Sequence, residues 1–252
     1  MSKKSLLMSL LFIPGNRVER FDKVKNTNAS GIIIDLEDTV ADIDQKNKAR
    51  NGVIKYLKKT PREKESFKYC LRINSLNTIH GFRDVLSLLE ADVVPDVLIL
   101  PMVESANTLH QLDSLFKEKA PSYIALIEST EGYRNIDQIA HSSRNIEGLA
   151  LGGGDLASEL GALCSWDSLL YFRSRLVAAA KNANLIALDV PYNDIRVQNN
   201  DLFREEVRKI KSLGFDGKLC IHSRQVDILQ EIFNISEAKC HSVELGSSDF
   251  NL

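Results

Sequence analysis

The chain has 252 residues, of which 44% are hydrophobic and 26% are charged, and its formal net charge is -2. This composition is typical of a folded globular protein and excludes disordered, collagen-like and disulfide-rich small proteins. Because 32 Lys and Arg residues nearly balance 34 Asp and Glu residues, the overall charge favours neither nucleic acid nor an anionic membrane surface as a partner.

The first predicted element is an apolar run over residues 6–15, preceded by Lys3 and Lys4. Two lysines before an apolar run resemble a short secretory signal, but Pro14, Gly15 and a charged segment follow instead of a small-residue cleavage site. We therefore interpret the run as a buried first strand. No apolar run approaches the ~18 residues of a membrane span, and the expected location is the cytoplasm.

Seven more apolar runs follow, at residues 31–38, 68–74, 96–104, 123–129, 148–155, 185–192 and 217–223. They are continuously apolar, which is typical of parallel strands covered on both faces. Between them lie amphipathic stretches with helical spacing, at residues 17–29, 44–59, 81–91, 105–120, 168–185 and 200–214. We expect helix caps at Asn77 or Thr78 and at Asp167, and helix-ending glycines at Gly31 and Gly214.

Eight strand–helix units in 252 residues predict an α/β fold, a closed (β/α)8 TIM barrel with outer helices. A doubly wound open sheet is the alternative, although it normally has fewer strands. Because no linker interrupts the pattern, we expect one barrel domain over residues 1–235 and a short C-terminal tail over residues 236–252.

Polar residues follow nearly every predicted strand, and in a TIM barrel the chemistry gathers at these carboxyl ends. They are Asn16, Arg17, Glu37, Asp38, Arg72, Asn74, Glu104, Glu128, Asp155, Asp189 and His222. A single acid there is often only a solvated rim group. Five acids in one mouth (Glu37, Asp38, Glu104, Glu128 and Asp155) would repel one another and require a cation. Arg72, Arg17 or a divalent metal could supply the positive charge.

The five histidines are scattered, and the four cysteines (Cys70, Cys164, Cys220 and Cys240) form no zinc or redox motif. Oxygen ligands favour magnesium, which commonly uses one or two carboxylates. Glu128 and Asp155, after neighbouring predicted strands, suit such a site. Arg173 and Arg175, within the stretch 168–185, are interpreted as surface or subunit-contact residues.

Three consecutive glycines, Gly152, Gly153 and Gly154, precede Asp155. They could bring backbone N–H groups close to a substrate carboxylate, with Gly153 as a binding residue, or they could only permit a bulge or a tight strand exit. Both interpretations remain open. The segment is not a dinucleotide-binding fingerprint, because the required glycine spacing after a first strand is missing.

From about residue 6 to about residue 233 the chain resembles the citrate lyase beta-subunit family of the HpcH/HpaI aldolase superfamily. The resemblance is carried by LFIPGNRVERFDK, GIIIDLEDTVADIDQKNKAR, LRINSLNTIHG, LPMVESA, ALIESTEGYRNIDQIA, LALGGGDLASELGA, YFRSRLVAAAKNANLIALDVPYNDIR and LGFDGKLCIHSRQV. It implies a magnesium-dependent barrel that cleaves or forms a carbon–carbon bond in a 3-hydroxy-acid thioester. Citryl, malyl or citramalyl esters of coenzyme A or an acyl carrier protein would yield an acetyl thioester and an oxo acid.

The resemblance also assigns roles to individual residues. It implies that Arg72 holds the oxo-acid carboxylate, that Glu128 and Asp155 bind magnesium, with Glu128 also facing the substrate, and that the acidic pair Glu37 and Asp38 lies near the metal and its waters. Arg17 matches a position near the thioester. A ring-forming homo-oligomer, a trimer, is the expected assembly.

Some positions depart from the family pattern. Gly154 stands where the family often has an acid, Val197 where it often has aspartate, and only a short segment follows Phe233. These departures motivate a second hypothesis, a non-catalytic paralogue that serves as a partner or regulatory subunit. A pyruvate-dependent aldolase acting on free aldehydes is a third.

Overall fold

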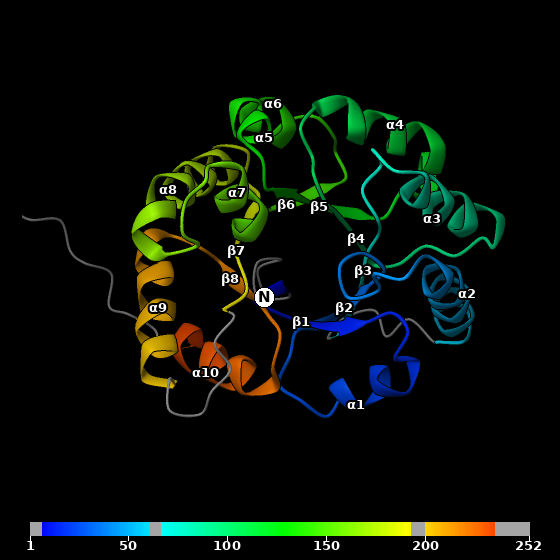
Figure 1. Ribbon diagram of the computed structural model, residues 1–252, viewed down its shortest axis with the longest axis horizontal. Helices are drawn as coiled ribbons and strands as arrows, with labels where there is room; N and C mark the ends of the chain where they lie inside the picture. Colours follow the sequence, from blue (N-terminus) through cyan, green and yellow to red (C-terminus); the bar gives the residue numbers. More distant parts are fainter. Residues whose placement is uncertain (1–6, 61–66, 193–199, 235–252) are drawn as a thin grey trace, which may run out of the picture.

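The computed structural model describes residues 7–60, 67–192 and 200–234. Eight strands alternate with helices along this part of the chain (Figure 1). In chain order the elements are β1 (Ser9–Pro14), η2 (Val18–Arg20), α1 (Phe21–Val24), β2 (Gly31–Asp35), α2 (Ile43–Lys59), β3 (Lys68–Arg72), α3 (Ile79–Glu90), β4 (Val97–Leu100), α4 (Ala106–Phe116), η3 (Lys117–Lys119), β5 (Ser122–Ile127), α5 (Thr130–Arg134), α6 (Ile136–Ala140), β6 (Ile146–Leu151), α7 (Gly153–Glu159), α8 (Trp166–Asn182), β7 (Ile186–Asp189), α9 (Asn200–Leu213), β8 (Gly217–Cys220) and α10 (Ser223–Asn234).

The strands form a closed parallel barrel in the order β1 to β8. Strand β8 returns to β1 with Ser9 opposite Lys218 and Leu11 opposite Cys220, which closes the sheet on itself. The helices lie around the outside of the barrel (Figure 1). The predicted (β/α)8 barrel is therefore confirmed, and the open sheet is excluded.

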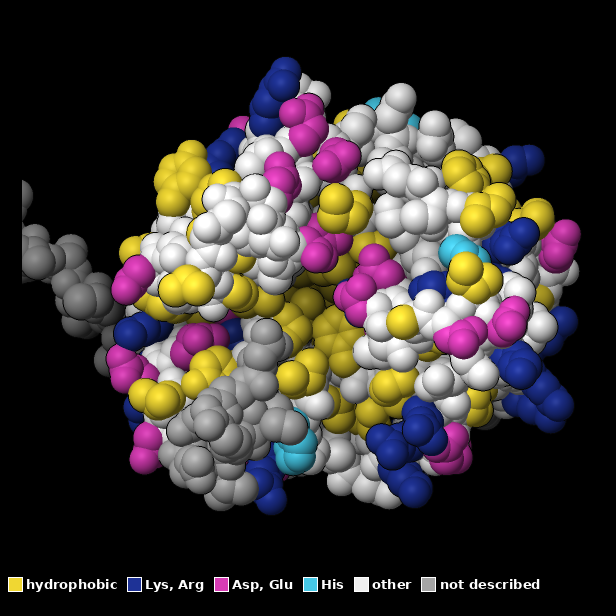
Figure 2. Space-filling view, viewed as in Figure 1, with side chains coloured by type: hydrophobic (Ala, Val, Ile, Leu, Met, Phe, Trp, Pro, Cys, Tyr) yellow, Lys and Arg dark blue, Asp and Glu magenta, His cyan; other side chains and the backbone are white. Residues whose placement is uncertain are grey.

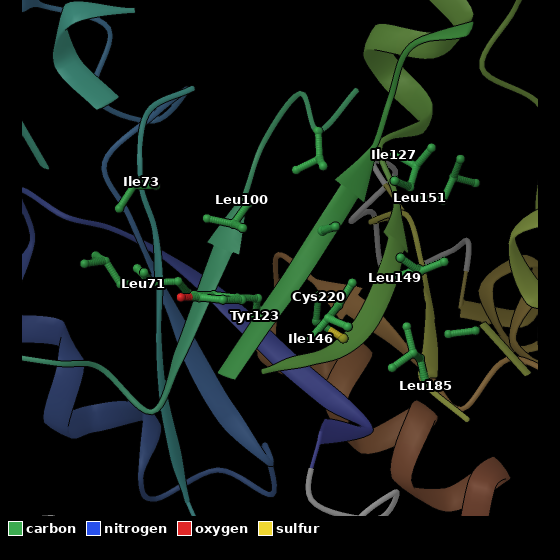
Figure 3. Close-up of a cluster of buried hydrophobic side chains, with 14 of the residues drawn as sticks. Leu71, Ile73, Leu100, Tyr123, Ile127, Ile146, Leu149, Leu151, Leu185 and Cys220 are labelled. Carbon is green, nitrogen blue, oxygen red and sulfur yellow. The ribbon is translucent and has the colours of Figure 1, made fainter. Parts of the chain in front are cut away.

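Alternate residues of each strand face the barrel interior or the surrounding helices. The interior is a small buried cluster to which every strand contributes, for example Leu10 from β1, Ile33 from β2 and Leu219 from β8. The larger cluster fills the space between strands and helices. Figure 3 shows part of this outer cluster, with Leu71, Leu100 and Tyr123 on neighbouring strands. Because of this alternation, the residues that keep the interior spacing at the end of a strand are the ones whose side chains reach the barrel mouth.

Several predicted boundaries need correction. Gly31 does not end a helix; it opens β2, where a Cβ atom would lie 2.3 Å from the Lys68 carbonyl oxygen of β3. The N-cap of α8 is Ser165, whose hydroxyl accepts the Ser168 N–H, and Asp167 lies in the first turn. Thr78 does cap α3, and Gly214, with φ of 101°, does follow α9.

Arg173 is neither a surface nor a contact residue in this chain. Its side chain is 4% exposed, and its Nε atom lies 2.9 Å from Asp189 Oδ1 at the end of β7. Arg175 does lie nearer the surface, paired with Asp137 of α6. The predicted tail at residues 236–252 and Val197 fall outside the described residues. None of the described helices is long and apolar enough to cross a membrane.

Candidate active site at the carboxyl ends of the strands

A cavity of about 310 Å³ opens at the carboxyl ends of the barrel strands. One side is polar, with Asp38, Thr39, Arg72, Glu128 and Asp155. The floor and the other side are apolar, lined by Phe12, Leu126, Leu151, Val190, Pro191, Leu219 and Ile221. Figure 2 shows hydrophobic side chains at the bottom of this hollow and acidic side chains along part of its rim. The mouth thus separates a charged half from an apolar half.

Asp35 and Arg72 form the centre of the polar half. They are the last residues of β2 and β3 and lie opposite each other in the sheet. Arg72 donates from Nε and Nη2 to the two carboxylate oxygens of Asp35, at 2.7 and 2.8 Å. Burial disfavours charge on Asp35, but the Arg72 bonds and the Thr39 hydroxyl hold the pKa of this carboxyl below its usual value. This two-pronged pair fixes the plane of the guanidinium.

The remaining terminal nitrogen of Arg72 faces the two acids that follow β2. Arg72 Nη1 lies 2.8 Å from Glu37 Oε2 and 3.0 Å from Asp38 Oδ2. Burial raises the pKa of Glu37 to about 8, with Asp38 and Glu128 adding to the rise and Arg72 opposing it. Glu37 can therefore hold a proton near neutral pH, which is the property a general acid needs. The other face of Arg72 lies over the Phe12 ring, 4.8 Å from its centroid.

Glu128 directly follows β5 and is 5% exposed. One of its oxygens accepts the Met102 N–H at 2.6 Å. Its other side packs on Gly152, where a Cβ atom would lie only 2.2 Å from Glu128 Cβ and Oε2. Burial raises the pKa of Glu128 to about 7, and the charge of Asp155 adds to this effect. Gly152 is therefore required for Glu128 to occupy its position.

Asp155 lies in the first turn of α7 and lines the cavity from the neighbouring strand–helix unit. Burial and the charge of Asp38 raise its pKa. The glycine segment forms the predicted tight strand exit and not a bulge: β6 ends at Leu151, Gly152 is the N-cap of α7, and the next two glycines begin the helix. Gly152, Gly153 and Gly154 all line the cavity.

The acidic side chains fit a divalent cation. Glu128 is buried, keeps one carboxylate oxygen away from the Met102 N–H, and has no ion-pair partner within the described part of the chain. Asp155 adds negative charge beside it, and the Arg72 charge offsets this only in part, since the pKa of Glu128 remains raised. No set of three His, Cys, Asp or Glu side chains groups as a metal cluster among residues 7–60, 67–192 and 200–234. Two carboxylates are a common protein contribution to magnesium, which takes its other ligands from water and substrate.

Seven of the eleven polar residues predicted after the strands do not line this cavity: Asn16, Arg17, Glu37, Asn74, Glu104, Asp189 and His222. Arg17 is exposed and does not line it. The Glu104 carbonyl accepts a hydrogen bond from Asn135 Nδ2 at 2.8 Å, and its side chain does not line the cavity either. Asp189 faces the helices, and His222 accepts the Arg224 N–H on the surface. The predicted convergence of five acids is thus wrong for Glu104, and Glu37 contacts the site through Arg72 without lining the cavity.

Sequence reasoning missed Asp35 and the requirement for Gly152. A usable signal existed, because interior positions alternate along each strand. Ile33, Cys70, Leu126 and Ala150 lie in the barrel interior, and two residues further on stand Asp35, Arg72, Glu128 and Gly152. The same count places Asp189 on the outer face, one residue after the interior Leu188.

Comparisons with known proteins show the family and the fold. Residues 8–223 match the family model described as HpcH/HpaI aldolase/citrate lyase. Human mitochondrial citramalyl-CoA lyase is 30% identical over 252 residues, covering 92% of this chain and 72% of the relative. Citrate lyase subunit beta of Haemophilus influenzae is 33% identical, covering 90% and 80%. The citrate lyase beta subunit of M. tuberculosis, solved with oxaloacetate and magnesium, superimposes with a TM-score of 0.77 at 30% identity, covering 93% of this chain and 100% of that one.

Proposed function

The chain belongs to the HpcH/HpaI aldolase/citrate lyase family, and from this premise we propose how its barrel mouth works. The protein is a magnesium-dependent carbon–carbon lyase that acts on 3-hydroxy-acid thioesters, giving or using an acetyl thioester and an oxo acid. The observation that carries the residue assignment is the buried, unpaired Glu128 beside Asp155, across one cavity from Arg72.

Each polar residue has a distinct role in this proposal. Glu128 and Asp155 hold magnesium, which supplies Lewis-acid polarisation of the oxo-acid oxygen when bound. Arg72 binds the oxo-acid carboxylate through its guanidinium, whose plane Asp35 fixes. Glu37 holds a proton at its carboxyl near neutral pH and contacts Arg72, although it does not itself line the cavity. Asp38 lines the same cavity and is largely exposed, so it would accept hydrogen bonds from the waters of a bound metal ion.

The apolar half excludes water from one side of the reacting carbon chain. Leu126 and Leu219 form the floor, and Phe12 covers the face of Arg72. Gly153, as a cavity-lining residue without a side chain, leaves room for the substrate carboxylate. We assign the thioester arm to Arg17, which is exposed and lies outside the cavity lining. The thioester carrier is either coenzyme A or an acyl carrier protein.

Thermal unfolding tests the proposal directly. The protein is melted alone, with magnesium, and with magnesium plus oxaloacetate, glyoxylate or pyruvate. A ligand at about one hundred times its Kd stabilises the folded state by about 2.7 kcal/mol, which corresponds to roughly 5–10 °C in Tm at this size. Absence of any shift, together with no turnover of citryl-, malyl- or citramalyl-CoA, would refute the assignment; Asp155→Ala is the control for contaminating activity.

Gly154 supports one alternative, a non-catalytic partner subunit, because open space remains where the family often places an acid: no atom lies within 4 Å of a Cβ atom built there. Metal and oxo-acid binding without thioester turnover would favour it. Release of acetyl thioester excludes the third hypothesis, an aldolase acting on free aldehydes.

We also propose that the chain forms a homotrimer in the cytoplasm. Helices α3 and α4 expose large apolar side chains, including Phe82 at 58%, Leu86 at 54% and Leu115 at 52%. An assembly would cover this surface. Cys70, Cys164 and Cys220 are free thiols, which fits a reducing compartment. Light scattering should give three times the chain mass, and a monomeric mass at micromolar concentration would contradict the trimer.

A further inference from the structure

Lys46, on the inner side of α2, binds the backbone of the loop that carries the acidic pair. Its ammonium group donates to the carbonyl oxygens of Leu36 and Glu37, at 3.0 and 2.9 Å, and to Asn74 Oδ1 at 2.6 Å. An ammonium group has three donors, so these contacts use all of them. Lys46 does not line the cavity, and any effect on the site must pass through the groups it holds.

The third acceptor, Asn74, is itself fixed by a buried chain of side chains. Asp84 Oδ2 accepts the Asn74 backbone N–H at 2.8 Å and its Nδ2 group at 2.7 Å. The other oxygen of Asp84 accepts from Arg50 Nε at 2.6 Å. Asn74, Asp84 and Arg50 are each at most 4% exposed. The chain joins α2, α3 and the end of β3, so the Lys46 ammonium has a defined anchor.

The groups held by Lys46 lie on both sides of Arg72. Glu37, whose backbone Lys46 binds, contacts Arg72 Nη1 through its carboxylate at 2.8 Å. Asn74 follows Arg72 by two residues, and the Leu36 N–H donates to the Arg72 carbonyl oxygen at 3.0 Å. A shift of this loop would therefore move both the guanidinium and its acidic partner.

We propose that Lys46 is a positioning residue for Arg72 and Glu37, anchored by the Arg50–Asp84–Asn74 chain. The part of this inference that concerns oxo-acid binding rests on the proposed function. Lys46 holds the loop after β2 against the end of β3, and this sets the direction in which Arg72 presents its guanidinium to the cavity. Glu128 and Asp155 follow β5 and β6, away from this support, so we expect metal binding to depend on Lys46 much less than oxo-acid binding does.

Lys46→Met tests the proposal, with Lys181→Met as the matched control. Lys181 pairs with Asp216 at the amino ends of β7 and β8, at the opposite end of the barrel from the cavity. A displacement on the scale of 1 Å can cost about a hundredfold in binding or rate, and we expect oxo-acid affinity of Lys46→Met to fall about tenfold or more. Its affinity for magnesium alone should stay within about twofold of wild type. Lys181→Met should change neither affinity.

A second measurement does not depend on substrate. The Arg72 Nε–H donates to Asp35, so it should give a sharp, slowly exchanging ¹⁵N signal, identified by its loss in Arg72→Lys. Lys46→Met should shift or broaden this signal, and Lys181→Met should leave it unchanged. If Lys46→Met proves too unstable, Asn74→Ala removes one anchor and should move the signal in the same direction.

The outcomes separate the two proposals. An unchanged Arg72 signal in Lys46→Met would overturn the positioning role. So would equal losses of magnesium and oxo-acid affinity, which indicate general loosening. A wild-type protein that binds no oxo acid would refute the proposed function, and the Arg72 signal would still decide the role of Lys46. Partial recovery of oxo-acid affinity in Lys46→Arg would support the positioning role of Lys46, because this variant keeps the charge and several donors.

Discussion

Gly152 and Gly154 stand two residues apart, and a methyl group on each would meet opposite surroundings. On Gly152 it would lie 2.2 Å from Glu128, whereas on Gly154 no atom lies within 4 Å. We expect Gly152→Ala to displace Glu128, lower magnesium affinity about tenfold and cost about 1–3 kcal/mol of stability. Gly154→Ala, within α7, should be neutral or stabilising by up to about 1 kcal/mol. Calorimetric magnesium titration and urea unfolding compare the pair; equal effects would contradict this reading.

Glu37 gives a prediction about pH. Its pKa in the folded protein is about 8, above the usual 4.5, so folding favours the protonated carboxyl. Burial of Glu37 therefore does not lower the free energy of unfolding below about pH 4.5. Between about pH 4.5 and 8 it lowers this free energy increasingly as pH rises. Glu37→Gln removes this titration. The stability difference between variant and wild type should shift in favour of Gln by at most about 1.4 kcal/mol per pH unit in that window. Urea unfolding in EDTA measures it, and a pH-independent difference would refute the shifted pKa.

For single residues, the sequence predicted which residue types lie at the strand ends better than it predicted where their side chains point. Arg72, Glu128 and Asp155 were predicted from their place after strands, and all three line one cavity. Asp35 does not stand out in the sequence as a site residue, because two further acids, Glu37 and Asp38, follow it within the same acidic motif. The role of Lys46 could not be predicted, since it depends on how closely α2 approaches the ends of β2 and β3.

Elements β7, β8, α8 and α9 are joined by a buried ion network on the outer face of the barrel. Lys218 Nζ lies 2.5 Å from Asp189 Oδ2 and 2.7 Å from Glu206 Oε1, and Arg173 binds the other Asp189 oxygen. Breaking a buried pair leaves an uncompensated charge, so Lys218→Met should cost about 3 kcal/mol. Lys209→Met, which removes an exposed pair with Glu205 on the same helix, should leave the urea midpoint nearly unchanged. A tolerated Lys218→Met would show that the network contributes little.

Element boundaries were harder to predict than the elements themselves. Each of the eight apolar runs overlaps a strand, but the runs at residues 31–38 and 96–104 extend beyond β2 and β4, because Leu36, Pro101 and Val103 after these strands are also buried. Helices α5, α6 and α7 have five to seven residues, too few for a periodic pattern to stand out. Gly31 is predicted to end a helix because glycine is common at that place. In the structure it instead allows β2 to pack closely against β3.

The acid stability of the whole barrel should depend on Asp35. Its folded-state pKa is held below the usual 3.8, so its contribution is complete above that pH and is lost as pH falls through the lower folded value. Asp35→Asn should lose about 3 kcal/mol at neutral pH, since Arg72 keeps a buried charge without its main partner. Its stability should then fall less steeply than that of wild type below about pH 4. Circular dichroism during acid titration checks this, and parallel acid transitions would contradict it.

Barrel closure places the first strand beside the last, and this has a consequence for the cavity wall. Most of the apolar lining comes from Phe12 of β1, Val190 and Pro191 after β7, and Leu219 and Ile221 in and after β8, with Leu126 and Leu151 from β5 and β6 completing it. Phe12 adjoins the residues of β8 because the first and last strands of the sheet pair with each other. The acids and the guanidinium come from β2, β3 and β5 to α7. Substitutions in this apolar wall could therefore change which oxo-acid substituent the cavity accepts, without altering the acids and the guanidinium proposed to act on the bond.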